Sequence, residues 1–221
     1  MRITVNVAMT LDGKIDTVTR QGAKISSVSD WERVDKLRAE SDAILVGGHT
    51  LLDEDPRLNV KSAKLREERV ARGLEPDPVK VGIVSTSTLS DNSHFLTEGA
   101  GEIIIFTTQR TSANQLAFLR EMGVVVFVLG KKRVDLHATM EVLKEFGTEN
   151  LMVEGGGAII AALLAKGLVD EIQAYIAPLI FGGATAPTLA DGMGFLEGIN
   201  LDLISVEKVK DGGILAKYEV A

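Results

Sequence analysis

The chain has 221 residues, of which 45% are hydrophobic and 25% are charged. This is the composition of an ordinary folded protein, and it excludes a largely disordered chain. The 24 basic and 31 acidic residues give a net charge of −7, which argues against a general nucleic-acid or membrane-surface binder. The longest apolar run, residues 155–165, is too short to span a bilayer, and the first residues lack a signal-peptide segment. We therefore expect a cytoplasmic protein with no nucleic-acid or membrane partner.

The sequence contains no cysteine and three histidines, His49, His94 and His137. The lack of cysteine excludes disulfides, iron–sulfur clusters, thiol nucleophiles and the Cys-ligated zinc of nucleobase deaminases. None of the histidines stands in a close pair of metal ligands, so no metal site is predicted. The chemistry of the protein must come from carboxylates, amines, guanidinium groups, hydroxyls, backbone amides or a bound organic cofactor.

Short apolar runs alternate with helical patterns along the whole chain. This alternation predicts an α/β domain with a mostly parallel central sheet flanked by helices. The predicted strands cover residues 3–9, 43–47, 79–84, 103–106, 124–129 and 151–154, and the predicted helices cover residues 29–40, 112–122 and 135–146. Two last strands, 201–210 and 214–220, are joined by an Asp-Gly-Gly turn and predict a C-terminal antiparallel hairpin. Without repeats or linkers, residues 1–221 are expected to form a single domain.

Three local patterns refine these elements. The helix over residues 29–40 opens with a predicted capping box, in which Ser29 and Glu32 satisfy free backbone amides. The polar stretch 61–78 is predicted to be a surface loop or a short helix. Residues 174–181 are apolar on both faces, so we expect them at the sheet centre or at a subunit contact.

Three consecutive glycines, Gly155 to Gly157, follow a predicted buried strand and precede an apolar helical run. Backbone amides at a helix N-terminus bind anions, so this turn predicts a phosphate or pyrophosphate site. A tight turn without a ligand is the alternative. The spacing does not fit the dinucleotide fingerprint of Rossmann folds, because Ile160 stands where that pattern needs its last glycine.

A second polar segment, residues 47–58, begins with a glycine pair. Thr50 is predicted to cap a short helix whose amides face a phosphate. The acidic residues Asp53, Glu54 and Asp55 favour a solvated turn over a cation site. The roles of two cations outside this segment stay open. Lys14 follows an Asp-Gly turn, and Arg38 is either a surface charge or a phosphate ligand.

Five motifs in this order resemble the riboflavin-pathway reductases: M-T-L-D-G-K, L-R-A-x-S-D-A-I-L-V-G, T-L-L-x-E-D-P-R-L, V-E-G-G-G and L-V-D-E-x-x-x-Y-I-A-P-x-I-F-G-G. These enzymes are relatives of the C-terminal half of the bacterial bifunctional deaminase–reductase. The chain is most similar to the archaeal and fungal enzymes that act on 2,5-diamino-6-ribosylamino-4(3H)-pyrimidinone 5′-phosphate, and no deaminase domain is expected. The resemblance implies a dihydrofolate-reductase-like fold, a homodimer, and NADPH as hydride donor, with NADH as the alternative.

The resemblance also implies the site residues. The cofactor contacts it implies are Ala8, Ile25, Thr50, Glu54, Ser87, Gly155, Gly156, Gly157 and Ala158. The substrate contacts it implies are Ala23, Arg38, Leu58, Lys61 and Glu154. The chain departs from the family at Glu54, where Asp is usual, at Lys61, where Arg or His stands, and at Ala158, where Thr is common.

The implied reaction is a hydride transfer to the ribosyl group, which requires a proton donor near the sugar. Lys14 and Glu154 are the candidate catalytic residues, and Glu154 is alternatively a hydrogen-bond partner of the pyrimidine amino groups. Two other functions stay open at this point: reduction of the deaminated pyrimidine, 5-amino-6-ribosylaminouracil 5′-phosphate, and a nucleotide-binding module of the same fold without turnover.

Overall fold

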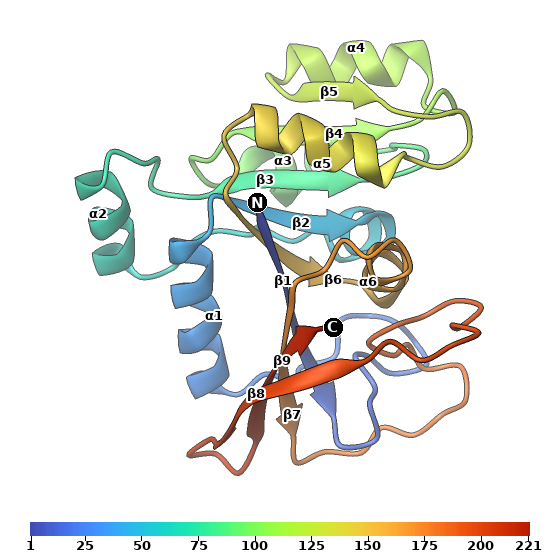
Figure 1. Ribbon diagram of the computed structural model, residues 1–221. Helices are drawn as coiled ribbons and strands as arrows, with labels where there is room; N and C mark the ends of the chain where they lie inside the picture. Colours follow the sequence, from blue (N-terminus) through green and yellow to red (C-terminus); the bar gives the residue numbers. More distant parts are fainter. The chain divides into compact units, whose positions relative to one another are not determined.

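The computed structural model describes residues 1–221, which form two compact units (Figure 1). The first unit consists of Met1 and Asp35–Met152, and the second consists of Arg2–Val34 and Val153–Ala221. The chain passes from one unit to the other within helix α1 (Val28–Glu40) and again within strand β6 (Asn150–Gly155). Each unit has its own set of paired strands and is described separately.

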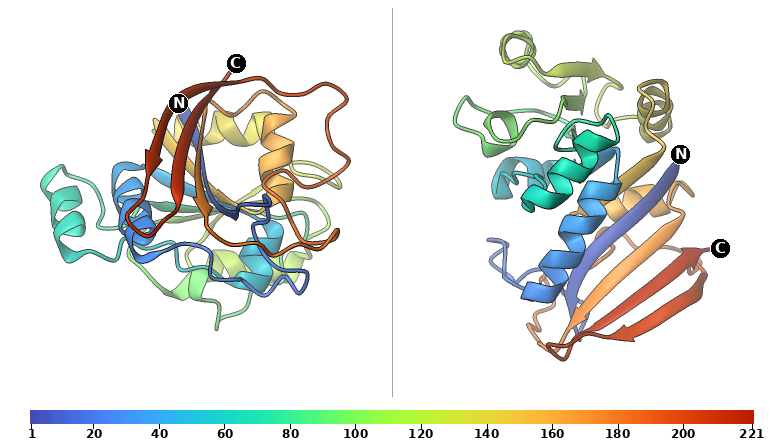
Figure 2. Two further views of the ribbon diagram at one scale, coloured as in Figure 1. Left: turned by 90° about the horizontal axis from the view of Figure 1, so that it is seen from below. Right: turned by 90° about the vertical axis from the view of Figure 1, so that its left-hand side faces the viewer.

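The first unit has a parallel sheet in the order β5-β4-β3-β2. Its strands are β2 (Ala43–Gly47), β3 (Val79–Ile83), β4 (Ile103–Thr107) and β5 (Val125–Val128), and its helices are α2 (Ala63–Ala71), α3 (His94–Thr97), α4 (Ala113–Glu121) and α5 (Leu136–Glu145). All five residues of β2 are buried, as expected for a parallel strand covered on both faces. Figures 1 and 2 show α5 on one face of this sheet and α3 and α4 on the other.

The second unit has a mixed sheet in the order β1-β7-β9-β8. Strands β1 (Arg2–Thr10) and β7 (Glu171–Ala177) are parallel, whereas β9 (Ile214–Val220) pairs antiparallel with both β7 and β8 (Leu201–Lys208). Helix α6 (Gly157–Leu164) follows β6. The β8–β9 hairpin ends in a turn beside the start of α1 (Figure 2), where Asp211 of the turn accepts a hydrogen bond from the Ser29 hydroxyl.

The predicted α/β class, with a mostly parallel sheet and a C-terminal antiparallel hairpin, is confirmed. The six predicted strands and three predicted helices all occur, with ends that differ by at most one residue. The polar stretch 61–78 contains the short helix α2. The apolar run 174–181 begins in β7, which lies between β1 and β9 at the sheet centre and is not an edge strand. The single reductase domain over residues 1–221 stays a prediction.

The predicted capping box at Ser29 is wrong. The helix begins one residue earlier, and the Ser27 hydroxyl accepts a hydrogen bond from the Asp30 amide at 3.1 Å. Ser27 therefore occupies the N-cap position, with the side-chain-to-amide bond typical of it. The Ser29 hydroxyl donates instead to Asp211. Local spacing suggested the wrong serine because the competing partner of Ser29 lies 182 residues away in the sequence.

The outer strand of the second unit exposes apolar side chains. Leu201, Leu203 and Val206 of β8 lie opposite alternate residues of β9 and therefore share one face with Ile214. These four residues, which we call the outer hairpin face, are between 39% and 57% exposed. Each helix of the structure is too short or too polar to span a bilayer.

Candidate functional site

The glycine turn joins β6 to α6 in the second unit. Gly155 has φ +116°, a conformation that side chains rarely adopt, and a Cβ built there would meet nothing within 4 Å. Gly156 is the N-cap of α6, and no side chain caps this helix start. Ala158 is exposed in the first turn. The turn therefore presents an uncapped helix N-terminus beside open space, which is the arrangement that binds phosphate groups.

Gly157 is required for a different reason. A Cβ at Gly157 would lie 2.2 Å from the carbonyl oxygen of Thr188, so the segment after β7 packs against the glycine backbone. The Gly157 carbonyl also accepts a hydrogen bond from the Asp191 amide at 3.1 Å. Gly155 thus faces free space, as the predicted phosphate site requires. Gly157 is needed for packing, as the alternative of a tight turn without a ligand requires.

Two of the expected cofactor contacts, Ala8 and Ile25, lie in one apolar cluster of the second unit. The buried members are Ile25, Tyr175 and Ala177, and Ala8, Phe181 and Val209 pack against them. The partly buried members are the apolar side chains of this cluster that remain accessible to a flat aromatic ring. Burial raises the pKa of the Tyr175 hydroxyl, and the neighbouring Asp211 carboxylate raises it further, which keeps the phenol protonated.

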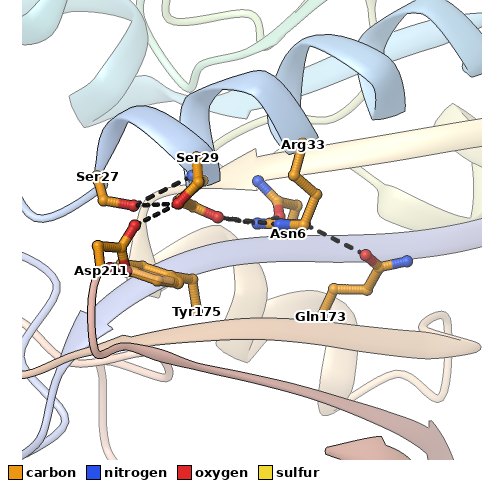
Figure 3. Close-up of polar contacts among 8 residues, drawn as sticks. Asn6, Ser27, Ser29, Arg33, Gln173, Tyr175 and Asp211 are labelled. Atoms are coloured by element: carbon orange, nitrogen blue, oxygen red, sulfur yellow. Dashed lines mark hydrogen bonds and ion pairs between the residues drawn. The ribbon is translucent and has the colours of Figure 1, made fainter. Parts of the chain in front are cut away.

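A polar network covers the face of β1 and β7 beneath α1 (Figure 3). Arg33 of α1 donates to Asn6 of β1 at 2.7 Å and to Gln173 of β7 at 3.2 Å. It also forms an ion pair at 2.7 Å with Asp30, whose side chain is fully buried. The network is not apparent in the sequence, because Asn6 and Gln173 lie in strands and contact Arg33 only through the folded structure. It fixes the start of α1 on the sheet.

The expected catalytic and sugar-side residues of the second unit are Lys14, Ala23 and Glu154. The Lys14 ammonium lies 3.3 Å from the carbonyl of Ala186 and is half-buried. The Ala23 amide donates to Asp16 at 2.9 Å, and this buried carboxylate orders the loop that carries Ala23. Glu154 is half-buried in β6, directly before the glycine turn. These three residues come from three separate segments, after β1, before α1 and in β6.

In the first unit, the end of β2 leads into a helical turn that carries Thr50 and Glu54. The turn spans Thr50–Glu54, and the Thr50 hydroxyl donates to the Glu54 carboxylate at 3.1 Å. The prediction that Thr50 caps this helix is wrong, because His49 holds the N-cap position and makes no side-chain cap bond. His49 instead lies 2.6 Å from the Asp53 carboxylate. The structure thus brings two expected cofactor residues, Thr50 and Glu54, into direct contact.

The expected substrate residues of this unit lie along one segment. The interpretation of Arg38 as a surface charge is wrong, because Arg38 is buried and donates to the Asn59 carbonyl at 2.9 Å. Leu58 is only 2% exposed and has φ +53°, so its backbone is the part left for a ligand. Lys61 has an exposed side chain, while its amide donates to Asp35 at 2.6 Å. Arg38 therefore fixes this segment whatever else it binds.

Ser87 lies in the segment that follows β3. It is 3% exposed, and its hydroxyl has no hydrogen-bond partner within the protein. Its amide donates to the Thr111 hydroxyl at 2.9 Å. The neighbouring Thr86 hydroxyl is likewise buried without a partner. Buried hydroxyls are normally paired, so this pair indicates a polar group that reaches them from a ligand or water.

Three carboxylates outside the expected site residues hold the same segments. Asp35 accepts from Lys61 and Ser62, and Asp77 is buried and accepts from the Val60 amide at 2.9 Å. Asp55 is half-buried and accepts three hydrogen bonds, which contradicts the interpretation of a solvated acidic turn at this residue. No group of three or more His, Asp or Glu side chains is placed to hold a metal ion.

Known proteins similar to this chain identify its family. The profile of the RibD C-terminal domain family matches residues 1–215. The chain is 41% identical to the 2,5-diamino-6-ribosylamino-4(3H)-pyrimidinone 5′-phosphate reductase of Archaeoglobus fulgidus over 94% of this chain and 93% of that one. It is 41% identical to the same-named enzyme of Methanothermobacter thermautotrophicus over 88% of this chain and 86% of that one.

Among solved structures, the fold is similar to that of a pyrimidine reductase-like protein from Corynebacterium diphtheriae. The TM-score is 0.84, and the match covers 100% of this chain and 92% of that chain at 20% sequence identity. This likeness bears on the fold alone. It agrees with the α/β class and the C-terminal antiparallel strands described above.

Proposed function

Because the chain belongs to the RibD C-terminal domain family, we propose that it reduces 2,5-diamino-6-ribosylamino-4(3H)-pyrimidinone 5′-phosphate in riboflavin biosynthesis. The reaction converts the ribosyl group into the ribitylamino product. The observation that carries this proposal is the 41% identity over almost the whole length of two reductases with this name.

A reductase of this family takes a nicotinamide cofactor, and we propose NADPH as the preferred one. Several of the expected cofactor residues fit parts of such a dinucleotide. The glycine turn offers an uncapped helix start for phosphate groups, and the partly buried members of the cluster around Ile25 and Tyr175 offer an apolar surface for a ring. The Ser87 hydroxyl, buried without a protein partner, supplies a further hydrogen bond to a polar cofactor atom. When bound, the dihydronicotinamide supplies the hydride.

The residues of the chain itself have three tasks in this proposal. Arg38 and Lys61 supply positive charge for the substrate phosphate, which an acidic protein with a net charge of −7 must concentrate locally. Lys14 donates a proton near the sugar, and its ammonium already lies near a backbone carbonyl that orients it. Glu154 either shares the proton transfer or accepts hydrogen bonds from the pyrimidine amino groups.

We also propose that the protein is a homodimer and that the outer hairpin face lies in the contact. Apolar side chains rarely stay exposed as a contiguous set on a monomer, and Leu203 and Val206 are each 57% exposed on an outer strand. A second copy of the same face is a suitable cover, because a two-fold contact is self-complementary.

The test is a turnover assay with the purified protein. NADPH absorbance should fall when the diamino pyrimidine phosphate is added, and mass spectrometry should find a product with two more hydrogens than the substrate. Turnover with the deaminated pyrimidine alone would identify the other reductase activity. Cofactor binding without turnover on either pyrimidine would indicate the non-catalytic module and refute the proposal.

A further inference from the structure

Asp55 directly follows the turn that carries Thr50 and Glu54. Asp55 ends this turn with φ +46° and ψ +60°, the left-handed conformation, which is uncommon for a residue other than glycine. Such a conformation persists where surrounding contacts enforce it. The contacts of the Asp55 side chain therefore determine how the Thr50–Glu54 turn ends.

Those contacts all lead to the start of helix α3, about 40 residues further along the chain. The Oδ1 atom of Asp55 accepts from the Ser93 hydroxyl at 2.6 Å and from the Phe95 amide at 3.0 Å. Its Oδ2 atom accepts from the His94 amide at 2.7 Å. Burial raises the pKa of Asp55, but these three hydrogen bonds outweigh it and lower the pKa overall, so the carboxylate is charged at neutral pH.

The other end of α3 is held by Lys80, which extends from the middle of the sheet in β3. Lys80 is 1% exposed, and its ammonium donates to the carbonyl of Phe95 and, at 2.6 Å, to that of Glu98. Burial lowers the pKa of Lys80 to about 8, so the amine is still largely protonated at neutral pH. A single turn of helix is thus fixed to the sheet at its C-terminal end and to Asp55 at its N-terminal end.

We infer that Asp55 is a positioning residue for the cofactor: by binding α3, which Lys80 fixes to the sheet, it sets the conformation of the Thr50–Glu54 turn. This inference rests on the proposed function, in which Thr50 and Glu54 contact the cofactor. Asp55 itself acts through these two residues and is not a catalytic residue. Its loss should weaken cofactor binding more than substrate binding.

A matched control exists in the same unit. Asp42 is also half-buried and also accepts backbone hydrogen bonds, from Glu149 at 2.9 Å and from Asn150 at 2.7 Å. It lies before β2, at the opposite end of the strand from the Thr50–Glu54 turn. Asp42→Asn therefore reports the general cost of a lost carboxylate, and Asp55→Asn reports that cost plus any effect on the turn.

The experiment measures the NADPH dissociation constant by fluorescence, the KM for the pyrimidine at saturating NADPH, and the melting temperature. We expect Asp55→Asn to raise the NADPH dissociation constant about tenfold, the effect of weakening one charge-assisted hydrogen bond, with the KM for the pyrimidine little changed. Asp42→Asn should lower the melting temperature without this change in affinity. Ser93→Ala, which removes one donor to Asp55, should give a smaller shift in the same direction and serves if Asp55→Asn does not fold.

Two outcomes separate the inference from the proposed function. If the wild-type protein binds NADPH and both Asp55→Asn and Ser93→Ala bind it equally well, the positioning role is refuted and the proposed function stands. The same holds if Asp42→Asn loses as much affinity as Asp55→Asn. If the wild-type protein itself binds no nicotinamide cofactor, the proposed function fails, and the positioning role fails with it.

Discussion

The hydroxyl of Tyr175, in the central strand β7, lies 3.1 Å from the Asp211 carboxylate in the turn between β8 and β9. The same carboxylate accepts a hydrogen bond from Ser29 at the start of α1. Hydrogen bonds from the Ser27 and Ser29 hydroxyls lower the pKa of Asp211 to about 2. One side chain thus connects the hairpin turn, the first turn of α1 and the apolar cluster that contains Ile25 (Figure 3).

This connection predicts a pH dependence of stability. The folded-state pKa of Asp211, about 2, lies below the value of about 3.9 in an unfolded chain. The carboxylate therefore stabilises the fold fully above about pH 4, and this contribution is lost as the pH falls through 2. Asp211→Asn should lower the melting temperature at neutral pH and flatten its decline between pH 4 and pH 2. Melting curves across this range test it, with Asp202→Asn on the exposed strand β8 as control; an unchanged decline would contradict it.

At the start of α1, the sequence predicts the position of the helix but not its N-cap residue. The position of the helix followed from its apolar spacing and was correct within one residue. The cap was misassigned because Ser27 and Ser29 both precede an acidic residue at the right distance, and only the long-range contact with Asp211 distinguishes them. Local patterns predict elements well, whereas the choice between adjacent polar residues depends on partners that are distant in sequence.

Arg38→Ala should weaken binding of the pyrimidine phosphate by roughly 1.5–3 kcal/mol, the range for a charge-assisted hydrogen bond, with little effect on NADPH affinity. It should also lower the melting temperature, because the buried guanidinium holds the Asn59 carbonyl. Arg69→Ala is the matched control, since Arg69 is also buried and donates to the carbonyls of Ala39 and Ser41. Calorimetric titration in which both variants lose the same substrate affinity would assign Arg38 a structural role alone.

Gly156→Val should abolish NADPH binding while the fold survives. Gly156 has φ −77° and ψ −174°, which is extended backbone, and a side chain at this position would stand at the uncapped start of α6. Gly198→Val is the control, because a Cβ at Gly198 meets nothing within 4 Å and lies outside the glycine turn. Fluorescence titration measures both variants. A folded Gly156→Val protein with normal NADPH affinity would remove the phosphate assignment.

Some features of the candidate site, like those of the fold, could be predicted from the sequence, and others could not. The glycine turn and the contact between Thr50 and Glu54 lie in segments that the sequence marked by glycine, hydroxyl and acidic residues. Asp55 and Lys80 were missed, because an acid in an acidic run and a lysine in a strand both look like solvated charges. Burial and the distant carbonyl and amide partners give them their roles, and neither is visible in local sequence.

The proposed homodimer predicts a mass of twice 23.7 kDa in light scattering at micromolar concentration. Replacing Leu203 and Val206 together with Asp should shift the mass to that of the monomer, because charged groups cannot be buried unpaired in a contact. Val70→Asp, on α2 at 54% exposure, should leave the mass unchanged. A wild-type monomer would refute the dimer, and a double variant that stays dimeric would place the contact elsewhere.

The last prediction concerns the choice of pyrimidine and the role of Glu154. A pocket that recognises the 2-amino group should reject the deaminated analogue, since an unpaired buried partner costs about 1–3 kcal/mol, or roughly thirtyfold in kcat/KM at the middle of that range. If Glu154 accepts the hydrogen bond from the pyrimidine amino group, Glu154→Gln should reduce this preference, because the amide also donates to a carbonyl. If Glu154 supplies the proton, the same variant should lower kcat for both pyrimidines and leave their ratio unchanged. Steady-state kinetics of the wild type and Glu154→Gln with each pyrimidine distinguish the two roles, and a wild-type preference for the deaminated compound would overturn the choice of substrate while leaving the family assignment intact.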